Sequence, residues 1–351
     1  MKILVLSNMS AKPSAPMQGL FVDNQVASLK AANDNIDYYK IKWNTDSLFC
    51  KLFKYPVFIL HFLWDIVIKR EKYALIHVHF YFPTIILAFL YKSLKNKHVK
   101  VIVTCHGTDV YSYSPPSYLY KRLSKIVDFW IFTSEELRSR FFKQVDSSTV
   151  LCAGYDDKVF NLPTENAREN KVYDFLQIGT LNKNKGLDRF LYLVSKMPHL
   201  RFAIVGEGPL KEEVLNAAKI YPNLEYLANQ RPNNLSSIIQ KSKFLLSLSR
   251  NESFGLTITE GHSCGVPCIA TVTDGSQAQI FNNDFLIEQE GITETAIRDS
   301  LQVVLEKMSA LDKNSYQEIV ELVSASTKTY SLSYVTEQIK SIYEHELKDS
   351  K

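Results

Sequence analysis

Short apolar runs rich in Val, Ile, Leu and Phe recur along the chain and alternate with segments whose apolar positions follow a helical spacing. Buried apolar strands that alternate with helices are typical of parallel sheets covered by helices on both faces. The predicted strands of a first series are 3–6, 36–41, 75–78, 99–103 and 129–132. Those of a second series are 172–178, 201–205, 243–248 and 267–271. The pattern therefore predicts an α/β fold with two parallel sheets.

The two series predict two Rossmann-like domains joined by a linker. The stretch NLPTENAREN at 161–170 is polar and has no periodicity, so it is predicted to be that linker. We expect an N-terminal domain at 1–163 and a C-terminal domain at 171–330. The last segment, which contains SYVTEQIKSIYEHEL, has the apolar spacing of a further helix.

The composition is that of a folded protein, because 46% of the 351 residues are hydrophobic and 22% are charged. The five cysteines are scattered and odd in number, which favours reduced thiols in a cytosolic protein over a disulfide framework. The opening MKILVLSN is expected to be a first strand, since its apolar run is too short for a signal peptide. The apolar stretch at 55–70 contains His61 and Asp65 and is not expected to span a bilayer.

Charge is divided unevenly between the two predicted domains. Residues 1–165 contain 21 Lys and Arg against 14 Asp and Glu, whereas residues 166–351 contain 20 against 23. A basic first half indicates an anionic partner, either a membrane surface or a substrate that carries phosphate. Nucleic acid is disfavoured, because the basic residues are not interleaved with a platform of aromatic residues.

The stretch SRNESFGLTITEGHSCGVPCIA at 249–270 carries the main candidate chemistry. A loop with Glu252 and Gly255 follows a predicted strand, and the helix after it has Glu260 on its second turn. The amides at a helix start favour an anion, and Gly255 lets the backbone approach it. Glu260 could then accept hydrogen bonds from a ribose, with Glu252 on the other side of the anion beside a polar ring. The alternative is a solvated helix carboxylate at Glu260 and a dipole-stabilised acid at Glu252.

These and other motifs resemble the retaining GT-B glycosyltransferases of family 4, also called glycosyl transferases group 1. The resemblance runs over nearly the whole chain. The family's E-x7-E and G-x-P pattern matches Glu252, Glu260, Gly265 and Pro267. Its glycine and basic signature matches IGTLNKNKG, with Gly179, Lys185 and Gly186. In the first domain VTCHGTDV resembles its His-Gly turn with His106, and PMQGLFVDNQVASL resembles the loop around Gly19.

The resemblance implies a GT-B fold, in which two Rossmann-like domains face a cleft and a C-terminal helix at 331–351 packs back on the first domain. It implies transfer of a sugar, with retention and without a metal, from a nucleoside-diphosphate sugar to a hydroxyl of a growing cell-surface glycan. Such glycans include polysaccharide, lipopolysaccharide and similar lipid-linked acceptors. UDP sugar is favoured over GDP sugar as the co-substrate, and no further cofactor is expected.

The resemblance also assigns roles to residues. Lys185 would stabilise the leaving diphosphate, Glu252 would bind sugar hydroxyls, and His106 would contact the sugar from the other domain. The predicted donor site comprises Gly179, Thr180, Lys185, Arg250, Phe254, Gly255, Leu256 and Glu260. Gly19 and Asp109 are predicted at the acceptor site. For Asp109, orienting the His106 turn and capping a surface helix remain alternatives.

The chain departs from the family pattern at three places. The family's Gly-Gly in the first loop is reduced to Gly19 alone. Thr180 stands where the family usually has an arginine, so Arg250, or else Lys183, is expected to supply that charge. Gln277 stands where the family has an acid. These departures keep open a second hypothesis, an inactive relative that binds a nucleotide sugar or a partner.

His77 and His79 lie two apart on a predicted strand and so face the same side, as a metal pair would. No third ligand follows nearby, so we expect histidines of the core or cleft and predict no metal site. Cys264 and Cys268 are interpreted as small core residues for the same reason, since no second pair of soft ligands follows.

The segment KLFKYPVFILHFLWDIVIKREK at 51–72 has a predicted apolar face with Leu52, Ile59, Phe62, Leu63 and Ile66. Lys and Arg residues cluster at its ends, and the stretch YKSLKNKHVK at 91–100 is also basic. A core helix with solvated ends is one interpretation. The other is peripheral attachment of a cytoplasmic protein to the anionic inner face of a membrane.

Overall fold

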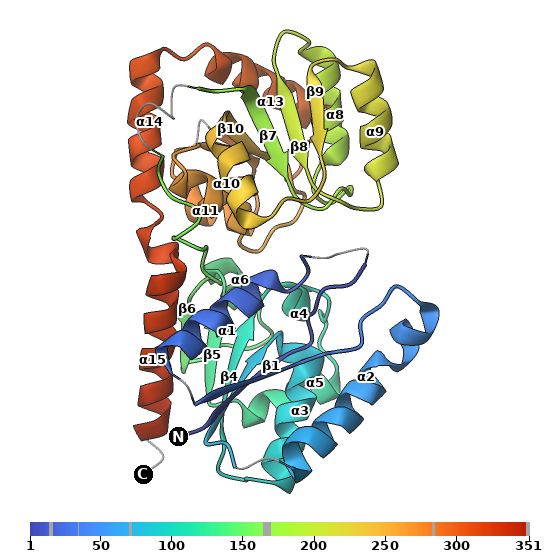
Figure 1. Ribbon diagram of the computed structural model, residues 1–351, viewed down its shortest axis with the longest axis vertical. Coiled ribbons are helices and arrows are strands. Elements are labelled where there is room, and N and C mark those ends of the chain that lie inside the picture. The colour runs from blue at the N-terminus through green and yellow to red at the C-terminus, as the bar shows by residue number, and fades with distance from the viewer. Residues whose placement is uncertain (14–16, 34, 70–71, 164–169, 283–284, 349–351) are drawn as a thin grey trace. The chain divides into compact units, whose positions relative to one another are not determined.

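The computed structural model describes residues 1–351 except 14–16, 34, 70–71, 164–169, 283–284 and 349–351. The described residues form two compact units, one of Met1–Gly154 with the chain from Leu332, and one of Tyr155–Ser331. Each unit contains a six-stranded sheet flanked by helices, and every described strand pair is parallel (Figure 1). The predicted fold class is confirmed.

The sheet of the first unit has the strand order β2-β1-β3-β4-β5-β6. Its strands are β1 (Ile3–Ser7), β2 (Ile36–Lys40), β3 (Leu75–His79), β4 (Lys100–Cys105), β5 (Phe129–Phe132) and β6 (Ser148–Val150). The described helices of this unit are α1 (Leu20–Ala32), α2 (Leu48–Phe62), η1 (Leu63–Ile68), α3 (Tyr81–Leu94), α4 (Thr108–Tyr111), α5 (Tyr118–Leu123), η2 (Ser124–Ile126), α6 (Glu135–Ser139) and α15 (Leu332–Lys348).

The sheet of the second unit has the order β12-β11-β10-β7-β8-β9. Its strands are β7 (Tyr173–Ile178), β8 (Phe202–Val205), β9 (Leu224–Leu227), β10 (Ser242–Ser247), β11 (Cys268–Thr271) and β12 (Leu286–Ile287). Its described helices are α8 (Leu187–Lys196), α9 (Lys211–Ile220), α10 (Pro232–Gln240), α11 (Leu256–Ser263), α12 (Asp274–Gln279), α13 (Glu294–Ser309), α14 (Lys313–Ala325) and η4 (Lys328–Tyr330).

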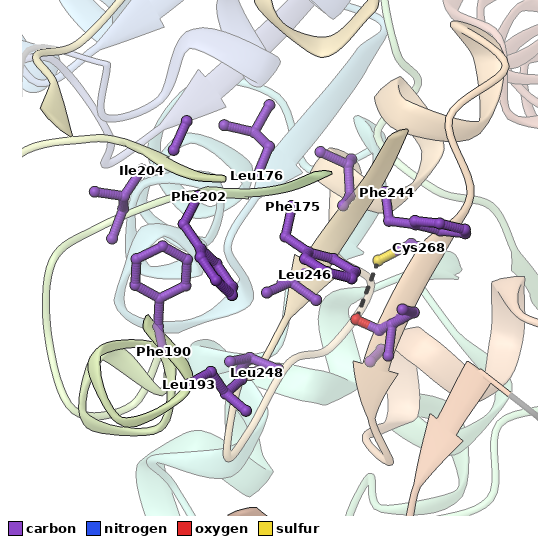
Figure 2. Packing of buried hydrophobic residues seen from close by; sticks show 14 of the residues in the cluster. Phe175, Leu176, Phe190, Leu193, Phe202, Ile204, Phe244, Leu246, Leu248 and Cys268 are labelled. Atoms are coloured by element: carbon purple, nitrogen blue, oxygen red, sulfur yellow. Dashed lines mark hydrogen bonds between the residues drawn. The ribbon is translucent and has the colours of Figure 1, made fainter. Parts of the chain in front are cut away.

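Each sheet is the centre of its own hydrophobic core. In the second unit the rings of Phe202 and Phe244 stack on either side of Phe175, with centroids 5.6 and 5.8 Å away (Figure 2). Cys264 and Cys268 are buried in this core as free thiols. The packing explains why the central strands are apolar on both faces.

All of the predicted strands are present, with small shifts at their ends. The sequence did not reveal β6, β9 and β12, and each of these three is an edge strand of its sheet. An edge strand is covered on fewer sides, so fewer of its residues are buried, and these three strands are also short, which makes their apolar signal weak.

The helix α15 belongs to the first unit although it follows the whole second unit in sequence. It packs beside α1 (Figure 1). The Tyr343 hydroxyl lies 2.6 Å from His77 Nδ1 on β3, and the Thr336 hydroxyl lies 2.7 Å from that of Ser28. The chain leaves the first unit after Gly154, before the linker that the sequence analysis placed at 161–170.

Candidate functional site

The candidate donor site lies where two central strands of the second sheet end. Strand β7 pairs with β8 on one side and with β10 on the other, so the chain connections diverge between β7 and β10. Ligands of open α/β sheets bind at such a point, outside the carboxyl ends of the strands. The loop after β7 carries Lys185, and the loop after β10 carries Glu252 and leads into α11.

Lys185 and Glu252 form an ion pair between these two loops. The Asn182 side chain accepts a 2.9 Å hydrogen bond from the Lys185 amide, and Gln177 donates one of 2.9 Å to the Lys185 carbonyl. Gly179 lies against the lysine stem, because a Cβ there would stand 3.8 Å from Lys185 Cδ. The structure thus brings together three residues that the sequence placed at the leaving diphosphate and the sugar.

Two glycines shape these loops. Gly186 has φ of 68°, and a Cβ on it would stand 2.0 Å from the Leu248 carbonyl oxygen. Gly255 has φ of 77° and caps the start of α11, where a Cβ would stand 3.2 Å from Glu252 Cγ. A side chain at Gly186 would separate the two loops, whereas one at Gly255 would crowd Glu252, and either would strain the backbone.

Glu260 lies on the second turn of α11 and is partly buried. Among the residues that the structure describes, none donates a hydrogen bond to its carboxylate and none forms an ion pair with it. Burial raises the pKa of Glu260 to about 8. A ligand hydroxyl that donates a hydrogen bond to this carboxyl group stabilises its charged form and so lowers its pKa toward the usual value.

The other predicted residues of the α11 loop have different surroundings. Leu256 is the first residue of α11 and is partly buried. The Phe254 side chain is buried, and its ring meets that of Tyr330 edge-on at 5.4 Å. Phe254 therefore anchors the loop from inside the unit, and only its backbone remains as a candidate contact with a donor.

Arg250 has partners that the sequence did not reveal. Its guanidinium donates hydrogen bonds of 3.0 and 2.9 Å to Asp188 and lies 3.1 Å from Glu294. It also donates to the Lys183 carbonyl. Arg250 therefore forms ion pairs with two carboxylates of its own unit and stabilises the loop that carries Glu252. The expectation that Arg250 replaces the missing arginine is not supported, and Thr180 is exposed.

Two residues that support this loop were missed. Arg189 on α8 is buried and binds both oxygens of Glu294, at 3.0 and 2.6 Å. Gln279 on α12 is buried, and its amide donates to the Phe254 carbonyl and, at 3.2 Å, to that of Gly275. The sequence analysis had singled out Gln277, which is exposed. Two residues along a helix turn the side chain to another face, and only the tertiary structure shows which one packs inward.

In the first unit His106 follows β4 in a turn that Asp109 holds. Asp109 accepts hydrogen bonds of 2.9 Å from the amides of His106 and Gly107, and one of 2.7 Å from the Tyr81 amide. Its side chain is buried, and burial raises the pKa of Asp109 to about 6 although these amides oppose the shift. Of the alternatives considered, this geometry supports orientation of the His106 turn. A surface cap is wrong, and the predicted contact with an acceptor has no support.

The His106 ring is held between aromatic side chains. Its centroid lies 5.1 Å from that of Phe21 and 4.4 Å from that of Phe80, and its Nε2 is 3.0 Å from His79 Nδ1. Burial lowers the pKa of His106 well below its usual value. His106 is therefore neutral at physiological pH and suited to hydrogen bonding rather than to carrying charge.

His77 and His79 are core histidines of this unit. His77 Nε2 lies 2.7 Å from the Thr104 hydroxyl, and its other nitrogen faces Tyr343. Within the described residues no group of three or more His, Cys, Asp or Glu is placed to hold a metal ion. Gly19, predicted at the acceptor site, has φ of 85° at the start of α1, and part of its loop, residues 14–16, lies outside the described residues.

The sequence matches two family profiles, one described as Glycosyl transferases group 1 over residues 160–319 and one as Glycosyltransferase Family 4 over residues 42–158. It is 26% identical to N-acetyl-alpha-D-glucosaminyl L-malate synthase of Bacillus anthracis, over 90% of this chain and 86% of that protein. It is 22% identical to one of the subunits of phosphatidylinositol N-acetylglucosaminyltransferase of Arabidopsis thaliana, over 81% of this chain and 64% of that protein.

Solved structures share the fold at lower identity. The structure of HepE from Anabaena in complex with UDP and glucose has a TM-score of 0.74 at 13% identity, over 98% of this chain and 100% of that one. The structure of sucrose-phosphate synthase from Thermosynechococcus elongatus has a TM-score of 0.75 at 16% identity, over 98% of this chain and 99% of that one. Likeness at this level of identity establishes the fold alone.

Proposed function

Because the chain belongs to the GT-B glycosyltransferases of the glycosyl transferases group 1 family, we propose that it transfers a sugar from a nucleoside-diphosphate sugar to a hydroxyl group. One observation carries the donor half of this proposal. Lys185 and Glu252 form an ion pair beside the start of α11, and Glu260 stands one turn further along that helix without a partner among the described residues. This order offers a cation and helix amides for a diphosphate and carboxylates for hydroxyls on either side.

In the proposed reaction Lys185 and the first amides of α11 stabilise the charge that grows on the departing diphosphate. Glu260 accepts hydrogen bonds from the ribose, and Glu252 accepts them from the sugar. The bond from the anomeric carbon to the phosphate oxygen breaks while the acceptor oxygen bonds on the same face. The acceptor proton passes to the departing phosphate oxygen. Neutral His106 is suited to hydrogen bonding, and no metal takes part in the proposed reaction.

UDP-N-acetylglucosamine is the donor that we propose first. The names of the relatives in Bacillus anthracis and Arabidopsis thaliana both contain the N-acetylglucosaminyl group. The HepE structure contains UDP. For the acceptor we propose a hydroxyl of a cell-surface glycan, either polysaccharide, lipopolysaccharide or a similar lipid-linked acceptor. A hydroxy acid such as L-malate is the second candidate, because the Bacillus anthracis relative is named for it.

The test measures release of nucleoside diphosphate from a panel of UDP and GDP sugars, with and without EDTA, in the presence of membrane glycolipids or of L-malate. We expect UDP release from one UDP sugar, unaffected by EDTA, and a product whose anomeric configuration by NMR equals that of the donor. The matched control is Glu252→Gln, which keeps the size of the side chain and should lower turnover. Tight binding of a nucleotide sugar without release or transfer under any condition would favour the inactive relative, to which Thr180 and Gln277 point.

A further inference from the structure

The segment from α2 through η1 presents two apolar faces. The inward face is buried and includes Phe58, Phe62 and Ile66, and the rings of Phe58 and Phe62 both lie 5.5 Å from that of Tyr39. A second face points away from the core. Its apolar side chains are 47% to 73% exposed, and they are Leu48, Phe49, Leu52, Phe53, Leu60, Trp64 and Ile68. We call these seven side chains the α2 stripe.

The α2 stripe is continuous along the helix. Leu48, Leu52, Leu60, Trp64 and Ile68 are spaced in multiples of four residues, and the position between Leu52 and Leu60 is an exposed proline. Successive members of such a series are neighbours on the helix surface, and the series winds slowly around the helix. Figure 1 shows α2 at the periphery of the first unit. One face of the helix therefore packs on the core, and a second apolar face is exposed. A helix that only covers a core needs a single apolar face.

Basic residues surround the α2 stripe. Between residues 48 and 69 the chain has three lysines, Lys51, Lys54 and Lys69, against one acid, Asp65, whose carboxylate faces Lys42 at 3.6 Å. Nothing in the described part of the chain pairs these three lysines with an acid. The Lys69 ammonium lies 4.9 Å from the Trp64 ring centroid, so cation and aromatic ring stand side by side.

A basic cavity adjoins the η1 end of the α2 stripe. It has a volume of about 690 Å³, and its charged lining consists of four lysines and two acids, namely Lys30, Lys40, Lys42, Lys69, Asp37 and Asp65. Lys40 and Lys42 face acids of the same unit, whereas Lys30 and Lys69 have no acidic partner among the described residues. The cavity can take an anionic headgroup while the neighbouring apolar side chains enter the acyl region.

From this arrangement we infer that the first unit docks on an anionic lipid bilayer through the α2 stripe, with Lys51, Lys54, Lys69 and the basic cavity at the headgroups. Exposed Leu and Phe beside Trp and Lys are the composition of helices that lie in a membrane interface. None of the described helices is long and apolar enough to cross a membrane. The inference goes beyond the proposed function and does not depend on the donor.

The structure corrects two details of the sequence-based hypothesis. The predicted apolar face mixed the two faces, since Phe62 and Ile66 are buried whereas Leu52 is exposed. The basic stretch at 91–100 contributes less than its charge indicates. Lys92 lies 3.5 Å from Asp128, and Lys100 lies 3.4 Å from Glu346, so both are engaged with acids of their own unit.

Vesicle flotation tests the inference. The full chain is mixed with vesicles of phosphatidylcholine alone or of phosphatidylcholine with phosphatidylglycerol, at low and at high salt. We expect flotation with the anionic vesicles at low salt and a marked loss at high salt. Lys51→Gln with Lys54→Gln and Lys69→Gln should abolish the preference for anionic vesicles. Flotation that is equal with both lipids and insensitive to salt would overturn the role of the lysines.

The contribution of the α2 stripe is tested by Leu52→Glu with Leu60→Glu. These side chains are exposed, so the fold should be retained, as circular dichroism can verify. The matched control is Val303→Glu with Leu322→Glu, which adds the same charge at two exposed positions of the second unit. We expect partition to anionic vesicles to fall about tenfold to a hundredfold for the stripe variant, the factor for withdrawing a Leu side chain from an apolar phase. Equal partition of both variants would overturn the inference.

Trp64 provides a direct signal of insertion. The chain contains three tryptophans, of which Trp130 is buried and Trp64 is exposed. Anionic vesicles should shift the emission to the blue in wild type and in Trp43→Phe, and the shift should be absent in Trp64→Phe. A shift that persists in Trp64→Phe would place the contact elsewhere. Analytical ultracentrifugation tests the alternative that a second copy of the chain covers the α2 stripe. Dimers of the wild type that are absent in the stripe variant, together with no vesicle binding, would support that alternative.

UDP release from the nucleotide sugar, with a soluble acceptor present, is measured on the same variants. None of the substituted residues belongs to the candidate donor site, so release should remain unchanged. Failure of vesicle binding with normal release would remove this inference alone, and absence of release with normal vesicle binding would remove the proposed function alone.

Discussion

The ion pair of Lys185 and Glu252 is the residue-scale feature on which the proposed reaction depends. Each charge is partly buried and compensates the other while no donor is bound. A diphosphate competes for the ammonium, and sugar hydroxyls compete for the carboxylate. The ion pair therefore holds both side chains between the two loops while the site is empty. Breaking it when a donor binds costs little free energy, since contacts of similar strength with the donor replace it.

Lys185→Ala should lower turnover by roughly 10²–10³-fold, because a preorganised positive charge at the leaving group acts mainly in the transition state. Lys183→Ala removes an exposed lysine of the same loop, the remaining candidate for the charge of the missing arginine, and it should lower turnover less than Lys185→Ala. Steady-state kinetics with the identified donor decide the matter. Comparable losses for both lysines would mean that the loop supplies charge without a specific role for Lys185.

The resemblance to the family motifs sufficed to place Lys185 and Glu252 on loops that the structure brings together, because both loops follow strands that the pattern already predicts. Arg250 could not be assigned in this way. Its partners Asp188 and Glu294 come from α8 and α13, and no local pattern connects three residues so far apart in sequence. The role of Asp109 also depended on burial, which the sequence left open.

At the scale of elements, the site depends on how closely the turns after β7 and β10 approach each other. Gly186 has a left-handed backbone and meets the Leu248 carbonyl, so both its φ and the available space exclude a side chain. Gly291 has a similar φ of 71°, but nothing lies within 4 Å of the position where its Cβ would be. Comparing substitutions at these two glycines therefore distinguishes the free-energy cost of the left-handed backbone from the cost of the steric clash.

Gly186→Ala should lower the free energy of unfolding by about 3 kcal/mol or more, because strain and a steric clash add. Gly291→Ala should lower it by about 1 kcal/mol, the cost of the left-handed conformation alone. Urea unfolding of both variants, followed by circular dichroism, measures the difference. Equal losses would show that the loops can separate freely, and the close approach would then have no energetic weight.

At the scale of the whole molecule, the two units carry buried titratable groups of opposite effect. Burial lowers the pKa of His79 to about 3, so the folded first unit rejects a proton that the unfolded chain takes up below its usual pKa of 6.5. Stability from this group is present above that pH and is lost on acidification. Glu260 in the second unit acts the other way. Its pKa is raised to about 8, so the folded state holds a proton that the unfolded chain releases above 4.5.

Glu260→Gln removes this second effect while keeping the shape of the side chain. We expect the thermal midpoints of variant and wild type to be similar below pH 4.5, and the variant to gain an advantage as the pH rises toward about 8. In the same variant the affinity for nucleotide sugar should fall, because a neutral amide replaces the carboxylate that accepts from the ribose. Calorimetry measures both quantities. A difference in midpoint that is independent of pH would contradict the assigned burial of Glu260.

The amino-acid sequence by itself determined the two parallel sheets, the central strands and the order of the donor motifs. These properties depend on local patterns: apolar runs bury strands on both faces, and strand ends place the following loops at one edge of a sheet. The edge strands β6, β9 and β12, the partners of Arg250 and the choice between Gln277 and Gln279 were decided only by the tertiary structure. The α2 stripe was decided in the same way, since a helix with two apolar faces does not reveal which of them the core covers. Burial depends on what packs against a residue from distant parts of the chain, and no local pattern contains that information.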